Sequence, residues 1–265
     1  GFTALRYNTT GICNTTVGHR SLYSNTGGSE NTSIGIQALF ANTTGGSNTA
    51  MGRNALFCNT TGINNIAVGN QSLSYNVTGN NNVSVGYRSL FCNIASGNTA
   101  VGNNSLRDNT TGVNSTAVGY GALYNNTSGN YNTAVGYHSL VSNTFGKYNT
   151  SVGRTSLNNN TTGNSNSAFG YSSLNSNTIG TNNTAVGYHT LFSNTTGGKN
   201  TAVGLQSLYT NTVGSNNAAF GYQALYSNTT NSNSAFGYKA LLSNTTGYGN
   251  SAFGRDSLKG NTIGT

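Results

Sequence analysis

Apolar and polar positions recur along this 265-residue chain with a period of 17 residues, whereas the 3.6-residue apolar spacing of a helix is missing. In each period an apolar residue precedes a glycine, a leucine follows that glycine by four residues and an asparagine follows it by seven. Sixteen such glycines, termed the spine glycines, run from Gly1 to Gly254. Their regular spacing predicts one structural unit copied along an axis, with each copy packed on its neighbours.

The residues on either side of the spine glycine predict two short strands per period. A Thr-Ala-Val stretch precedes the glycine, an Ala-Leu-aromatic stretch follows it, and Gly and Asn between them are typical of turns. We therefore expect an all-β chain, a parallel β-solenoid or β-roll of about 17 residues per coil and roughly sixteen coils. At about 4.8 Å per coil, sixteen coils predict a rod roughly 75 Å long. Two periods have 16 residues, Gly86 to Gly102 and Gly221 to Gly237, and we interpret each as a one-residue deletion in a turn.

Residues 1–265 are predicted to form a single continuous solenoid domain without caps, a segment of a longer array. Val and Leu, the large apolar positions, are expected inside the coil, and Ala and Ser where neighbouring backbones come close. The spine glycine and a second glycine ten residues later are both expected at positive φ. The asparagines seven residues after the spine glycine are expected to stack into a structural hydrogen-bonded ladder. This ladder would include Asn8, Asn25, Asn42, Asn59, Asn126, Asn194, Asn228 and Asn244.

Composition resembles that of a disordered chain at first sight, because only 5% of residues are charged and Gly, Asn, Thr and Ser dominate. Disorder gives no reason to keep leucine in every period, so we reject that interpretation. The net charge is +8. Six bases follow the spine glycine by one or two residues, which favours either an edge for anionic surfaces and polysaccharides or plain solubility. These bases are Arg20, Arg53, Arg88, Arg154, Lys239 and Arg255.

Catalytic chemistry is not predicted anywhere in the chain. The only carboxylates are Glu30, Asp108 and Asp256, and the three histidines lie many periods apart. We therefore expect no enzyme, catalytic group, cofactor, metal site or nucleic-acid motif. The three cysteines, Cys13, Cys58 and Cys92, form no disulfide framework, because the latter two share a position two coils apart, near 10 Å. No membrane span or signal peptide is recognised in this segment.

Asn-x-Thr/Ser motifs are frequent, but the asparagine persists where the motif is broken, as at Asn25, Asn143 and Asn177. A structural role for this asparagine is therefore favoured over glycosylation, although the sequence leaves glycosylation open.

Aromatic residues recur five residues after the spine glycine, directly after the invariant leucine. If leucine points inward, strand alternation turns this position outward, and the aromatic side chains either lie flat on the coil or form an interface between rods. Because two large apolar side chains per coil stabilise a lone rod thinly, we predict a lateral interface and, as the simplest closed assembly, a homotrimer. The predicted interface residues are Tyr23, Phe40, Phe57, Phe91, Tyr124, Phe192, Tyr209 and Tyr226. A second aromatic position directly follows the spine glycine, as at Tyr87 and Tyr188.

The units Asn-Thr-Ala-Val-Gly-Tyr at 132–137 and Ser-Asn-Thr-Thr-Gly at 193–197 resemble repeats of tail-fibre-domain-containing proteins of bacteria and phages. More distantly they resemble the head repeats of trimeric autotransporter adhesins, whose period is shorter. This resemblance implies a left-handed β-roll in a trimer.

Together these features predict a structural fibre protein at a cell surface, on a virion or otherwise outside the cell, with an attachment role. Self-association, possible continuation end to end, and weak, repeated binding of cell-surface glycans are the expected interactions. Two alternatives are a solenoid that binds ice or crystal surfaces through a flat Thr face, and a self-assembling extracellular filament without adhesive activity.

Overall fold

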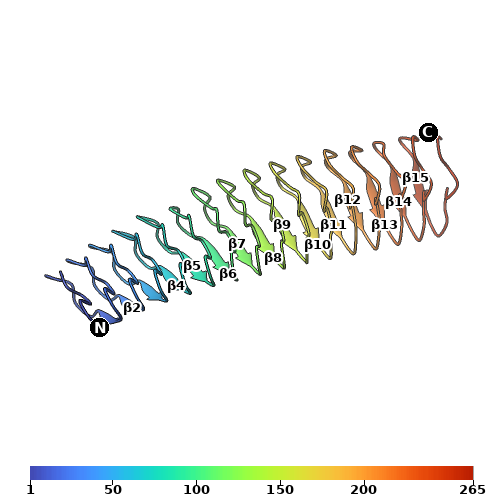
Figure 1. Cartoon of the computed structure of the whole chain (residues 1–265). Helices are drawn as coiled ribbons and strands as arrows, with labels where there is room; N and C mark the ends of the chain where they lie inside the picture. The colour runs from blue at the N-terminus through green and yellow to red at the C-terminus, as the bar shows by residue number, and fades with distance from the viewer. Residues whose placement is uncertain (265) are drawn as a thin grey trace. The chain divides into compact units, whose positions relative to one another are not determined.

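The computed structural model describes residues 1–264 and confirms the parallel β-solenoid. Fifteen short parallel strands, one per coil, make up the regular structure of these residues, which include no helix. The chain divides into two compact units, Gly1–Tyr131 and Asn132–Thr265. Within each unit the coils lie side by side, and their strands point the same way (Figure 1). The prediction of one continuous domain stays a prediction.

Every strand has three residues and ends directly before a spine glycine. The first unit contains β1 (Thr15–Val17), β2 (Thr32–Ile34), β3 (Thr49–Met51), β4 (Ile66–Val68), β5 (Val83–Val85), β6 (Thr99–Val101) and β7 (Thr116–Val118). The second unit contains β8 (Thr133–Val135), β9 (Thr150–Val152), β10 (Ser167–Phe169), β11 (Thr184–Val186), β12 (Thr201–Val203), β13 (Ala218–Phe220), β14 (Ser234–Phe236) and β15 (Ser251–Phe253).

Strand pairing keeps equivalent residues of neighbouring coils opposite one another. Thr32 pairs with Thr49, 17 residues later, whereas Val83 pairs with Thr99 across the first 16-residue period. In that short coil the carbonyl of Ala95 accepts the side-chain amides that a glycine carbonyl accepts in full-length coils. The missing residue therefore falls in the turn, as predicted.

The prediction of a second strand in each period, after the spine glycine, is wrong. In all sixteen periods the leucine has φ between 46° and 54°, so the Ala-Leu-aromatic stretch cannot be extended. The residue two positions earlier, such as Gln37 before Leu39, is also left-handed, which makes this stretch a series of turns. Neighbouring coils still bond there, since the Leu39 amide donates to the Ala55 carbonyl at 2.9 Å.

The interior is filled by leucine and by the small middle residue of each strand. Leu56 and Ala50 have no exposed surface, whereas Met51 is 40% exposed. The expectation that the valine position lies inside is therefore wrong. A strand alternates its side chains between faces, so burying the middle Ala or Ser turns both flanking residues outward.

The two glycine positions are required for different reasons. The spine glycine has the predicted positive φ, for example 138° at Gly52, and a Cβ there would lie 2.5 Å from the Gly69 carbonyl oxygen. The second glycine does not need positive φ in the full-length coils, which corrects the prediction. It is required by close packing, since a Cβ at Gly62 would lie 2.5 Å from the Gly79 carbonyl oxygen.

Candidate interaction surfaces

The eight asparagines predicted to stack along the coils all belong to a hydrogen-bonded ladder. Asn59 donates from Nδ2 to Oδ1 of Asn42 at 2.8 Å and to the carbonyl of Gly62 at 3.0 Å. The same pair of bonds recurs at Asn25, Asn42, Asn126, Asn194 and Asn244, with its second acceptor a glycine carbonyl. Asn8 donates to the Gly11 carbonyl, and Asn228 to Asn211 and to the Thr230 carbonyl. All except Asn8 are fully buried, so the glycosylation motifs that begin at the buried asparagines other than Asn25 are inaccessible in the folded chain.

A second asparagine ladder, four residues before the spine glycine, was not predicted. Asn48 donates from Nδ2 to Oδ1 of Asn31 at 3.2 Å and to the Gly62 carbonyl at 2.8 Å. The sequence did carry its signal, because this position is Asn in all but one period.

The first shortened coil interrupts the first ladder. Asn76 Oδ1 is buried and has no hydrogen-bond partner among the described residues. Asn93, one coil later, donates instead to the carbonyl of Ala95 at 2.8 Å. The deletion in this turn therefore costs one rung of the ladder, whereas the second shortened coil keeps its rung, from Asn228 to Asn211 at 3.3 Å.

The predicted interface aromatics are half-buried and stack along the coils. The rings of Tyr23, Phe40 and Phe57 follow one another at 5.2 Å with nearly parallel planes. The rings of Phe192, Tyr209 and Tyr226 do the same at 5.4 and 5.1 Å. Phe91 and Tyr124 are likewise half-buried. Since no strand forms at this position, alternation does not turn the rings outward, and a lateral interface there stays a prediction.

The positions one and two residues after the spine glycine form a more exposed surface, termed the glycine edge. Seven tyrosines of its first position are 39–49% exposed: Tyr87, Tyr120, Tyr137, Tyr171, Tyr188, Tyr222 and Tyr238. Basic side chains lie over these rings. The Arg154 guanidinium lies between Tyr137 and Tyr171, at 5.6 and 5.7 Å from the ring centroids. Such contacts hold the bases close to the surface.

His189 of the glycine edge is surrounded by aromatic rings. Its imidazole lies 4.0 Å from the Tyr188 ring centroid and 4.8 Å from that of Phe192, with Tyr171 and Tyr209 farther away. Burial among these rings lowers the pKa of His189 from its ordinary value of 6.5. The neutral imidazole is therefore favoured over a wider range of pH than in an exposed histidine.

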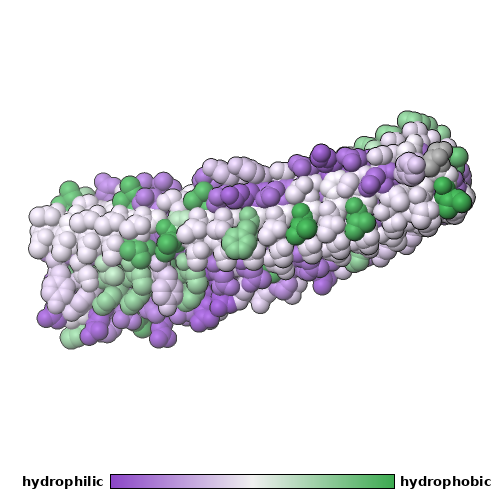
Figure 2. Space-filling view, turned by 90° about the horizontal axis from the view of Figure 1, so that it is seen from above, coloured by the Kyte–Doolittle hydropathy of each residue, from purple (hydrophilic) through white to green (hydrophobic). Residues whose placement is uncertain are grey.

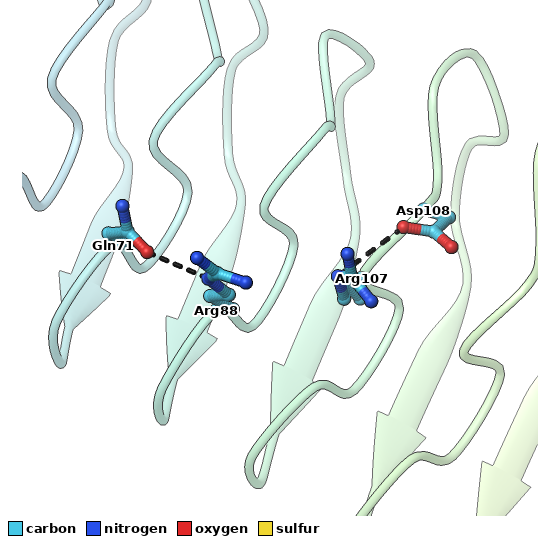
Figure 3. A network of polar contacts seen from close by, with 4 residues as sticks. All are labelled: Gln71, Arg88, Arg107 and Asp108. Carbon is cyan, nitrogen blue, oxygen red and sulfur yellow. Dashed lines mark hydrogen bonds and ion pairs between the residues drawn. The ribbon is translucent and has the colours of Figure 1, made fainter.

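Two neighbouring coils of the first unit illustrate how bases are held (Figure 3). The Nε of Arg88 donates to Oε1 of Gln71 in the preceding coil at 2.7 Å, and its guanidinium lies 5.2 Å from the ring centroids of Tyr87 and Phe91. Arg107, beside the edge, instead lies 3.6 Å from Oδ1 of Asp108. Arg88 thus keeps its charge unneutralised, whereas Arg107 does not.

The outward face of the strands, termed the strand face, contains the first and last residue of every strand. No strand contains a charged residue, although the chain has a net charge of +8. Its apolar side chains are partly exposed, for example 37% at Val101 and 40% at Phe169. Seen from above the view of Figure 1, hydrophobic side chains on the surface of the chain lie singly among near-neutral atoms, and hydrophilic side chains gather in separate patches (Figure 2).

Residue sizes on the strand face compensate for one another. Four strands end in phenylalanine, and these four begin with Ser or Ala: β10, β13, β14 and β15. The other eleven end in Val, Ile or Met, and all begin with Thr, Ile or Val. Phenylalanine at the end of a strand is thus paired only with Ser or Ala at its start, although β4 (Ile66 and Val68) and β5 (Val83 and Val85) have two medium-sized residues. On the strand face the largest side chains are therefore always compensated by the smallest.

Residues 1–264 contain no pocket and no group of three or more side chains that could hold a metal ion. Within the same range, no helix is long and apolar enough to cross a membrane. Cys13, Cys58 and Cys92 are free thiols, and burial raises the pKa of the latter two. The surfaces described above are thus the candidates for interaction.

Comparison of the chain with protein-family models, with curated proteins and with solved structures finds no match.

Proposed function

We propose that this chain is a structural fibre protein outside the cell or on a virion, in which several copies pack side by side through their strand faces. The size compensation on the strand face carries this proposal. A face in contact with water has no need to pair Phe with Ser or Ala, whereas a face packed against a partner must avoid both voids and overlaps. The absence of charge from the same face supports the proposal, since buried charges are costly.

The area of the strand face suits such an association. A three-residue strand is about 10 Å long and neighbouring strands are about 4.8 Å apart, so each coil offers roughly 50 Å². The seven strands of the first unit and the eight of the second then offer about 340 and 380 Å². Pairing both with a second copy would bury on the order of 1,400 Å², within the range of stable interfaces.

Another copy of the chain is the partner that fits best, because it has the same spacing between coils. A contact formed in one coil is then repeated in the next, without the drift that a partner of different period would introduce. A trimer remains our proposed assembly. The stacked rings of Tyr23, Phe40 and Phe57 would stiffen each copy but are not required at the interface.

The experiment is sedimentation of the chain and of Val101→Glu, which puts a charge on the strand face. We expect the parent chain to form a defined oligomer and Val101→Glu to be monomeric with unchanged circular dichroism. Thr111→Glu adds the same charge at an exposed turn and should leave the oligomer intact. A monomeric parent chain would refute the proposal.

A second variant tests whether compensation serves an interface or only packing within one copy. Ser234→Thr, in the strand ending with Phe236, adds one methyl to the strand face. If the face is an interface, this change weakens the oligomer and leaves the stability of the monomeric Val101→Glu background unchanged. If Ser234→Thr lowers the stability of the Val101→Glu background as much as that of the parent chain, the size compensation serves packing within one copy.

The ice- or crystal-binding alternative is less well supported. It requires a flat array of threonines, and nine strands do begin with an outward Thr. Phe169, Phe220, Phe236 and Phe253 interrupt that array beside Ser or Ala. A thermal-hysteresis measurement on the monomeric variant tests this alternative.

A further inference from the structure

Arginines on the glycine edge of the first unit recur at a regular interval. Arg20, Arg53 and Arg88 belong to the coils that begin with Gly18, Gly52 and Gly86, which are two coils apart. At about 4.8 Å per coil, these coils are spaced by about 10 Å along the stack; Arg20 and Arg88 are two residues after their glycine and Arg53 is one residue after it. The edge thus presents a row of positive charges with a fixed period.

These charges are not neutralised by neighbouring acids. The first unit has two carboxylates, and neither lies on the glycine edge. Glu30 accepts a hydrogen bond from Ser47 in the far turn, and Asp108 pairs with Arg107. Arg20 and Arg53 are exposed, whereas Arg88 is half-buried against two aromatic rings.

We propose that the glycine edge binds a linear acidic polysaccharide whose carboxylate or sulfate groups recur about every 10 Å, the interval of the arginines. This inference deepens the proposed function and rests on its attachment role. Arg guanidinium groups bind carboxylates and sulfates through paired N–H donors. The side chains of Gln37, Asn70 and Gln71, on the same edge, supply amide groups for sugar hydroxyls. Single contacts are weak at an exposed surface, but a polymer engages many coils at once.

The second unit also has bases on its glycine edge, held on tyrosines, but without the two-coil interval of the first unit. Arg154 lies between two tyrosine rings, and the Lys239 ammonium lies 5.7 and 5.2 Å from the ring centroids of Tyr222 and Tyr238. Asp256 is the single carboxylate on the edge among residues 1–264, and it pairs with Arg255 and Lys259. Each unit by itself therefore offers charged contacts to a polymer.

A nucleic acid fits this edge less well. Phosphates follow one another at about 3.4 Å along each strand of a duplex, far more densely than the arginines of the edge. Single-stranded nucleic acids bind chiefly by stacking bases on open aromatic faces. On the glycine edge the ring of Tyr171 stacks on that of Tyr188 at 5.2 Å and Arg154 lies over its other side, so these faces are already in use.

The test measures binding of the full chain to hyaluronan, which has one carboxylate per disaccharide, with neutral dextran and oligothymidylate as comparison polymers. We expect retention on hyaluronan that falls with salt, and none on dextran. Arg20→Gln with Arg53→Gln should weaken binding about three- to tenfold. Lys147→Gln with Lys199→Gln removes the same net charge at the far turns and should leave binding unchanged.

Equal weakening by the two double variants would overturn the inference, because net charge alone would then explain binding. No binding to hyaluronan, or tighter binding to oligothymidylate, would overturn it as well. Val101→Glu separates this inference from the proposed fibre, since it retains every base of the edge. Binding by the monomeric variant would support the polysaccharide site even if the parent chain fails to assemble. Assembly of the Arg20/Arg53 variant without binding would support both.

Discussion

Asn31 and Asn42 donate through their side-chain amides to the same acceptor, the carbonyl oxygen of Gly45, and both distances are 2.9 Å. Each asparagine also bonds to its counterpart in the preceding coil, so two ladders meet at one backbone atom here. The core therefore depends on satisfied amides as much as on leucine, because buried polar groups are costly unless they are bonded.

Asn59→Ala should destabilise the chain by roughly 3 kcal/mol, because it leaves the buried Oδ1 of Asn42 without a donor and removes the bond to the Gly62 carbonyl and the bond from the Asn76 amide. Asn70→Ala, on the exposed glycine edge, is the matched control and should change stability by less than about 0.5 kcal/mol. Urea denaturation followed by circular dichroism measures both. Similar costs for the two variants would contradict a stabilising ladder.

Gly52→Ala should cost about 3 kcal/mol or more, or prevent folding. Its φ of 138° disfavours a side chain, and a Cβ would overlap the Gly69 carbonyl. Gly27→Ala is the control, since the nearest contact of its Cβ would be 3.3 Å from Oγ1 of Thr10. Thermal unfolding of the two variants compares them, and a Gly52→Ala chain as stable as Gly27→Ala would show that the spine glycine is dispensable.

Leu56→Ile should destabilise the chain more than Leu56→Met, although all three side chains are apolar and similar in size. Leu56 is fully buried with φ of 50°, a conformation that β-branched residues strongly disfavour. We expect a cost of about 2–3 kcal/mol for Ile and below about 1.5 kcal/mol for Met. Chemical denaturation gives the order, and a reversed order would mean that volume rather than backbone conformation selects leucine.

Acidification should reduce stability through His189. Burial lowers its pKa in the folded chain, so the unfolded chain takes up the proton first. The histidine has no effect well above pH 6.5, and the free energy of unfolding should fall as pH drops below that value. NMR titration of the imidazole checks the direction of the pKa shift, and His189→Gln should flatten the pH dependence. A pKa above 6.5 would contradict the expected burial effect.

Periodicity was enough to predict the solenoid, the coil length, the two turn deletions and the first asparagine ladder, because these depend on spacing alone. It was not enough to predict the local backbone conformation within a coil. The stretch around Leu56 has strand-like composition, yet its leucine is left-handed, since hydrogen bonds between neighbouring coils select the backbone there. The residue before the spine glycine, Met51 in this coil, was wrongly predicted to point inward for a related reason. A strand of three residues is too short for its alternation to show from the sequence which face is buried.

The sequence by itself determined that one unit of about 17 residues is stacked many times, because a repeated pattern of Leu, Asn and Gly can satisfy itself only against its own copies. Tertiary structure alone decided which side chains point outward. Burying the small middle residue of a strand, such as Ala100 in β6, brings adjacent coils close and leaves Thr99 and Val101 on the opposite face. It thereby defined the uncharged strand face and the arginine-bearing glycine edge as separate surfaces.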